Sequence, residues 1–153
     1  MLIDALRAGL TIRYEDNGEW TITASMNNPS GQFNLIGYSY GSLLAAQTAN
    51  FYAKQGHIVD HLVLIGSPID ADFLSVLRAR KNIKRVIVVD LKDKGDPIYA
   101  GITQWELTKA APILEKQGAA ERGEGHFYYA HAVADSQARW SALAKHLYAQ
   151  GLR

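Results

Sequence analysis

Short apolar runs alternate with longer helical stretches from residue 33 to the end of the chain. The apolar runs predict strands at residues 33–36, 61–65 and 84–90. Helical spacing predicts helices at residues 43–54, 70–81, 106–116 and 127–150. Gly56 is placed to end the first of these helices and Asp70 to cap the second. The order of elements predicts parallel strands joined by right-handed crossovers, which is an α/β fold.

The run at residues 84–90 is β-branched and almost continuously apolar, as expected of a strand that is covered on both faces.

Residues 1–32 follow a different pattern. Helical spacing predicts a helix over residues 2–10, and alternation predicts two strands at 11–14 and 20–23. Asp16-Asn17-Gly18 between these strands is typical of a hairpin turn, because Asn-Gly supplies positive φ angles. Residues 27–31 have the composition of a loop.

The composition fits one globular domain over residues 1–153, with 48% hydrophobic residues to form a core. The 16 Lys and Arg residues nearly balance the 15 Asp and Glu residues, so we expect no surface for nucleic acid or for an anionic membrane. The chain has no cysteine, which excludes disulfides, thiolate catalysis and cysteine-based zinc sites. We expect neither a metal nor a cofactor.

The first ten residues carry Asp4 and Arg7 within a short apolar stretch, which is not the pattern of a secretory signal. No apolar run reaches the roughly 18 residues that a membrane-spanning helix needs. These observations predict a soluble protein without a transmembrane segment, cytoplasmic by default.

The sequence Gly37-Tyr38-Ser39-Tyr40-Gly41 joins the first apolar run of the α/β segment directly to a helix. At such a junction a serine on a strained turn exposes its hydroxyl, and glycines remove side chains that would collide. The helix directs its N-terminal amides at the same place, where negative charge develops on a substrate carbonyl. Ser39 is therefore our candidate nucleophile. The alternative is a tight turn with an inert serine.

This junction resembles the nucleophile elbow of the α/β-hydrolase superfamily, and the resemblance runs from about Phe33 to the C-terminus. It implies a three-layer α/β/α sandwich with a mostly parallel sheet. The sheet is expected to be much smaller than the usual eight strands, so the fold is short or truncated on its N-terminal side. Residues 33–153 would be the catalytic half, and residues 1–32 an atypical helix and hairpin.

The resemblance also implies a serine, an acid and a histidine in that order, on loops at the carboxyl ends of the strands. Asp96 is the candidate acid, because Asp96-Pro97-Ile98 resembles the Asp-Pro-hydrophobic signature of lipase-like members. Three further aspartates remain open as acids, or as caps and solvated turn residues: Asp93, Asp90 and Asp70.

His126 is the candidate base, because Gly125-His126-Phe127 resembles the final Gly-His-Phe turn of the superfamily. His131 is the one substitute we consider, although a helix would restrict its approach to Ser39. Surface or capping roles are expected for the remaining histidines, which are His57, His61 and His146, and Glu124 is expected only to line the loop.

The family pattern makes the amide of Tyr40 one donor to the oxyanion. A second donor normally comes from a loop upstream of the elbow, but residues 1–32 contain no His-Gly or glycine-rich run. This departure leaves three interpretations: the chain is a fragment that lacks an N-terminal segment, a partner chain or an unusual N-terminal arrangement completes the site, or efficient turnover has been lost.

The resemblance implies a serine hydrolase that cleaves small-molecule or lipid carboxylic esters through an acyl-enzyme, as esterases and lipases do. Tyr38, Tyr99 and Phe127 are the candidate substrate-lining residues, and an apolar acyl group would suit them. Packing beneath the loops is the equal alternative for these aromatics. A thioesterase with the same triad is the nearest rival function. A non-catalytic module that associates with another chain along its incomplete sheet is the alternative from a different class.

Overall fold

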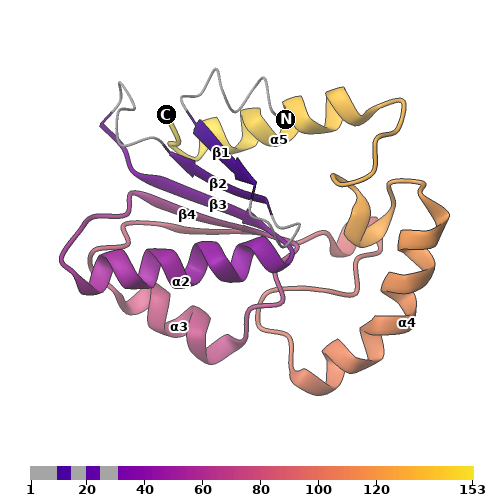
Figure 1. Cartoon of the computed structure of the whole chain (residues 1–153), viewed down its shortest axis with the longest axis horizontal. Helices are drawn as coiled ribbons and strands as arrows, with labels where there is room; N and C mark the ends of the chain where they lie inside the picture. The colour runs from indigo at the N-terminus through magenta and orange to yellow at the C-terminus, as the bar shows by residue number, and fades with distance from the viewer. Residues whose placement is uncertain (1–9, 15–19, 25–30) are drawn as a thin grey trace.

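A five-stranded sheet forms the centre of the fold, for which a computed structural model describes residues 10–14, 20–24 and 31–153 (Figure 1). The strands lie side by side in chain order: β1 (Leu10–Tyr14), β2 (Trp20–Ala24), β3 (Asn34–Tyr38), β4 (His61–Ile65) and β5 (Val86–Val89). Strands β1, β2 and β3 pair antiparallel, whereas β3, β4 and β5 pair parallel. The predicted α/β character and the three parallel strands are therefore confirmed.

Helices cover both faces of this sheet (Figure 1). Helices α2 (Tyr40–Lys54) and α3 (Ala71–Ala79) lie on one face, and α5 (Ser136–Ala149) lies on the other. Successive strand residues point to opposite faces, so β4 contributes to two cores. Leu62 and Leu64 pack in a cluster with the buried alanines of α2, whereas Val63 packs in a second cluster with Leu143 and Leu147 of α5. The predicted three-layer arrangement is confirmed.

The hairpin predicted near the N-terminus is confirmed by the antiparallel pairing of β1 and β2, in whose backbone register Ile12 is the partner of Ile22. Its second strand also pairs with β3, where Ile22 is the backbone partner of Ile36. The hairpin thus extends the sheet beside the strand that leads to Ser39. The helix predicted at residues 2–10 (apart from Leu10, the first residue of β1), the turn at 16–18 and most of the loop predicted at 27–31 lie outside the described residues.

One predicted helix was too long. The helix expected over residues 127–150 forms only from Ser136 onward. The preceding loop is held by tertiary bonds instead, since the Arg139 guanidinium donates to the carbonyl oxygens of Gly123 and Tyr128. Strand β5 is covered on both faces as predicted, since Val86 and Val88 pack against the cluster that contains α2 and α3, and Ile87 and Val89 pack in the cluster that contains α5. Only Ile87 is buried, because β5 is the last strand of the sheet in the described part of the chain.

Helix α4 (Gln104–Ala120) is longer than predicted and stands beyond the carboxyl ends of the parallel strands (Figure 1). It begins with a capping box, in which the Thr103 hydroxyl and the Glu106 carboxylate each bind the other's backbone amide. Two short 3₁₀ turns, η1 (Lys92–Lys94) and η2 (Gly125–Phe127), lie near its C-terminal half. None of the helices described is long and apolar enough to cross a lipid bilayer.

Candidate active site

Ser39 occupies a strained turn between β3 and α2. Its φ of 54° and ψ of −125° are unusual for a residue with a side chain. Among the described non-glycine residues, only Glu121 shares its positive φ. The Ser39 amide donates to the Ile65 carbonyl oxygen at 2.9 Å, which ties the turn to β4. Although Ser39 precedes the helix, its hydroxyl makes no capping bond. The turn therefore leaves the hydroxyl available for other contacts.

Gly37 makes this turn sterically feasible. A Cβ built on Gly37 would stand 2.3 Å from the Gly41 carbonyl oxygen and 2.4 Å from the Ser42 Cα. Both are backbone atoms that cannot move aside without moving the helix. The first glycine of the motif is thus required by the close approach of α2 to the end of β3.

The structure brings Ser39, His126 and Asp96 together in a chain of hydrogen bonds. Ser39 Oγ lies 2.7 Å from His126 Nε2, and His126 Nδ1 lies 2.9 Å from Asp96 Oδ2. Both the imidazole and the carboxylate are buried. A hydroxyl, an imidazole and a carboxylate in this order form an activated nucleophile, because the acceptor on Nδ1 fixes the tautomer that leaves Nε2 free to take the hydroxyl proton.

The other candidate acids lie in different surroundings. Asp70 caps α3 by accepting the Phe73 amide. Asp90 accepts the Ala100 amide at 3.0 Å, and exposed Asp93 pairs with Lys94 at 3.0 Å. Asp96 alone among these four is fully buried beside an imidazole. Its second oxygen, Oδ1, accepts the Ile98 amide at 2.8 Å, which holds the carboxylate in place.

The remaining histidines contact other groups. His131 stacks on Phe127 with ring centroids 4.8 Å apart, in a turn and not in the helix that we predicted. His61 lies at the opposite end of β4 from Ser39 and bonds Asn34 through Nδ1 at 2.7 Å. His57 packs edge-on against Tyr52. His146 is exposed on α5.

Tyr38 supports the base directly. Its ring stacks on the His126 imidazole with centroids 5.7 Å apart, and its hydroxyl donates to the His126 carbonyl oxygen. Burial, reinforced by the nearby Asp96 carboxylate, raises the pKa of the Tyr38 hydroxyl. The hydroxyl therefore stays protonated and able to donate. We predicted Tyr38 as a substrate-lining residue, and these contacts give it a structural attachment to the histidine loop.

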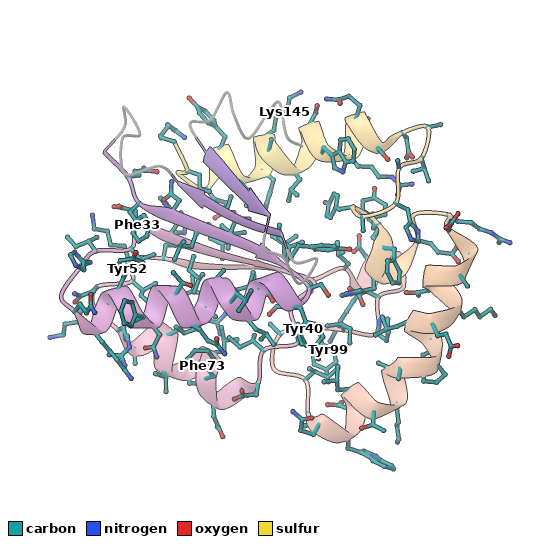
Figure 2. All side chains as sticks on the ribbon, viewed as in Figure 1. Phe33, Tyr40, Tyr52, Phe73, Tyr99 and Lys145 are labelled. Atoms are coloured by element: carbon teal, nitrogen blue, oxygen red, sulfur yellow. The ribbon has the colours of Figure 1, made fainter. Side chains whose placement is uncertain are left out.

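The other predicted lining residues lie around the same end of the sheet. Phe127 packs edge-on against the His126 ring with centroids 5.5 Å apart. Tyr99 donates its hydroxyl to the Glu106 carboxylate at 2.6 Å, and its ring lies beneath the Lys92 ammonium. Figure 2 shows Tyr40 where α2 begins and Tyr99 on the segment between β5 and α4.

Tyr40 is the first residue of α2, and the first N–H groups of a helix have no partner within it. Its amide is thus suited to bind an oxyanion next to Ser39. Residues 1–32, in which the sequence offers no pattern for a second donor, belong to the described residues only at 10–14, 20–24 and 31–32. Within the described part of the chain, no group of three or more acidic or histidine side chains is arranged to hold a metal ion.

Two residues of the site were missed by the sequence reasoning. Gly66 follows β4, and a Cβ there would stand 3.3 Å from Asp96 Oδ2 and 3.5 Å from His126 Cε1. Gln117 on α4 bonds the loops of both the acid and the base. Gly66 comes directly after an apolar run, as Gly37-Tyr38-Ser39 does, which is the one signal that could have drawn attention to it. Nothing in the sequence around Gln117 marks it.

The comparisons with known proteins concern the part of this site that contains Ser39. Residues 24–91, less than half of the chain, match the family model described as Thioesterase domain. The matched range contains β3, Ser39, α2, β4 and β5 but ends before Asp96 and His126. No curated protein and no solved structure matches the chain. The acid and the base therefore rest on the distances given above.

Proposed function

We propose that this chain, which belongs to the α/β-hydrolase superfamily, is a serine hydrolase that cleaves acyl thioesters with Ser39, His126 and Asp96 as its triad. Chemistry on ester or thioester bonds follows from the family match. The observation that carries the triad is the continuous hydrogen-bond chain, 2.7 Å from Oγ to Nε2 and 2.9 Å from Nδ1 to Oδ2. It joins three loops that are distant in sequence.

In the proposed reaction, Ser39 Oγ attacks the carbonyl carbon while its proton passes to His126 Nε2. Asp96 accepts the Nδ1 proton in a hydrogen bond and stabilises the imidazolium. The Tyr40 amide binds the negative oxygen of the tetrahedral intermediate. When the intermediate collapses, the C–S bond breaks and the His126 imidazolium gives its proton to the departing thiolate sulfur, which releases a thiol and leaves an acyl ester on Ser39. A water molecule gives its proton to Nε2, attacks this ester and releases the carboxylic acid, and the proton returns to Ser39.

The match to a thioesterase domain ranks thioesters above the carboxylic esters that the sequence reasoning placed first. Oxygen esters remain the second candidate, as in esterases and lipases. They are favoured by the short connection between β4 and β5, which contains the nine-residue helix α3 and no large cap. The same attack by Ser39 would serve either leaving group, so substrate preference has to be measured.

A fluorophosphonate probe, which reacts with activated serines, tests the triad. We expect it to label the wild-type chain at Ser39 and to leave Ser39→Ala unlabelled. Ser75→Ala is the matched control, because Ser75 is exposed on α3 and away from the site, and it should label like the wild type. A folded wild-type chain that is not labelled would refute the proposed function and favour the non-catalytic module.

A pair of substrates with the same acyl group, one an N-acetylcysteamine thioester and the other an oxygen ester of matched size, ranks the two candidates. The proposal expects a higher kcat/KM for the thioester. The loss of either activity in His126→Gln and Asp96→Asn should parallel the loss of probe labelling. A clear preference for the oxygen ester would replace the thioesterase proposal by an esterase.

A further inference from the structure

Gln117 lies between the loop that carries the acid and the loop that carries the base. Its Nε2 donates to the Gly95 carbonyl oxygen at 2.9 Å, next to Asp96. Its Oε1 accepts the backbone amide of His126 at 3.0 Å. A primary amide has a donor group on one side and an acceptor on the other, so this one side chain forms a hydrogen bond with each loop at the same time.

The loop that carries His126 leaves room for the Gln117 amide. A Cβ built on Gly125 would stand 2.2 Å from Gln117 Nε2 and 2.3 Å from its Oε1. Gly125 also has a φ of 55°, which favours glycine. Only a residue without a side chain lets the amide reach the backbone of the histidine loop in this conformation.

The backbone of His126 is held from a second direction as well. The Tyr38 hydroxyl donates to its carbonyl oxygen while Gln117 accepts its amide hydrogen. The two supports come from the elbow and from α4, which are separate elements. With both backbone polar groups of one residue fixed by side chains, the imidazole has little freedom to turn away from Ser39.

We propose that Gln117 is a positioning residue that fastens the acid loop to the histidine loop and so keeps His126 Nε2 within hydrogen-bond reach of Ser39 Oγ. The inference rests on the proposed function and deepens it. Gln117 touches neither Ser39 nor the Asp96 carboxylate in the contacts described, so it acts through His126 and Gly95. Small displacements of a catalytic group carry large costs in rate, of the order of a hundredfold for 1 Å.

Three variants test this role. Gln117→Met keeps the length of the side chain and removes both hydrogen bonds, whereas Gln117→Glu keeps an acceptor for the His126 amide and loses the donor to Gly95. Gln104→Met makes the same change as the first variant at an exposed position of the same helix. Each is measured for kcat, KM, the rate of labelling by the fluorophosphonate probe, and the midpoint of urea unfolding.

We expect Gln117→Met to lower kcat and the labelling rate by about tenfold to a hundredfold, with KM and the unfolding midpoint nearly unchanged. Gln117→Glu should recover part of the loss, and Gln104→Met should behave like the wild type. Hydrogen exchange at the His126 amide should also speed up in Gln117→Met, because this amide loses its acceptor.

Wild-type rates in Gln117→Met would overturn the inference while leaving the proposed function intact. A loss of activity no larger than the loss of folded protein would overturn it too, because that result indicates a purely structural role. A wild-type chain that is never labelled would remove the proposed function and this inference with it, which distinguishes the two failures.

Discussion

Gly66 lies against His126, with only 3.5 Å between the imidazole Cε1 and the point where a Cβ of residue 66 would stand. The same Cβ would be 3.3 Å from Asp96 Oδ2. Gly66 follows β4 directly and donates its amide to the Val89 carbonyl oxygen at 2.9 Å, so it cannot shift without disturbing the sheet. The residue after β4 therefore limits the space in which the acid and the base meet.

We predict that Gly66→Ala lowers kcat by several-fold to about tenfold, because the added methyl group displaces the Asp96 carboxylate, to which His126 is bonded, by a few tenths of an ångström. The φ of 51° at Gly66 adds a cost in stability of about 1 to 2 kcal/mol. Gly56→Ala separates these effects, since Gly56 has a φ of 85° and its Cβ would meet no atom within 4 Å in the part of the chain that the structure describes. It should lose similar stability and keep the wild-type kcat. Equal kcat in both variants would contradict the prediction.

Gly37→Ala is expected to be far more damaging than a substitution at any loop glycine. Its Cβ would meet backbone atoms of Gly41 and Ser42 at 2.3 to 2.4 Å, so β3 and α2 would have to separate. We expect a loss of more than about 3 kcal/mol in the free energy of unfolding, measured by urea denaturation. Gly31→Ala, at a positive φ and with no atom of the described residues within 4 Å of its Cβ, is the control. A Gly37→Ala protein as stable as this control would show that the elbow has another conformation.

Each of the three positions of the proposed triad has a local mark in the sequence. Ser39 lies between the glycines of its motif, Asp96 precedes a proline, and His126 follows a glycine. Gly66 and Gln117 have their roles only because segments far apart in sequence approach each other. Such contacts leave no local pattern, so they become visible only in the folded chain.

The helix predicted over residues 127–150 illustrates the same limit. Its residues have acceptable helix propensity, but propensity is a weak influence that tertiary contacts override. Arg139, from within α5, reaches back to the Gly123 and Tyr128 carbonyl oxygens, and the Ser136 hydroxyl accepts the Val133 amide at 2.8 Å. These bonds favour a folded-back loop over a continuous helix, and this loop places His126 beside Ser39.

Stability should fall in mild acid because of His61, at the end of the sheet opposite the elbow. Burial lowers the pKa of its imidazole below the ordinary value of 6.5, and the nearby Asp60 carboxylate only partly opposes this effect. The unfolded chain then takes up a proton at a higher pH than the folded chain does. The contribution of neutral His61 to the free energy of unfolding is therefore fully present above about pH 6.5 and is lost as the pH falls toward the lowered pKa.

We expect His61→Gln, which can still bond Asn34 but does not titrate, to flatten the dependence of the urea midpoint on pH between 7 and 5. The exposed His57 provides the control His57→Gln, which should keep the wild-type slope. A wild-type slope in His61→Gln would mean that another group causes the acid sensitivity. Because His61 lies far along β4 from Ser39, any change in probe labelling of the folded variant at pH 7 would also be unexpected.

Tyr38→Phe should separate the two contacts that this residue makes with His126. The phenylalanine ring keeps the stacking on the imidazole, while the bond from the hydroxyl to the His126 carbonyl oxygen is lost. A neutral hydrogen bond contributes about 0.5 to 1.5 kcal/mol, so we expect kcat to fall by roughly twofold to tenfold with little change in KM. Tyr148→Phe, exposed on α5, is the control.

Because Gln117 holds the other side of the His126 backbone, combining Tyr38→Phe with Gln117→Met should lower kcat by more than the product of the two single effects. Strict multiplication would indicate that the two supports act independently and that His126 is not held jointly by them.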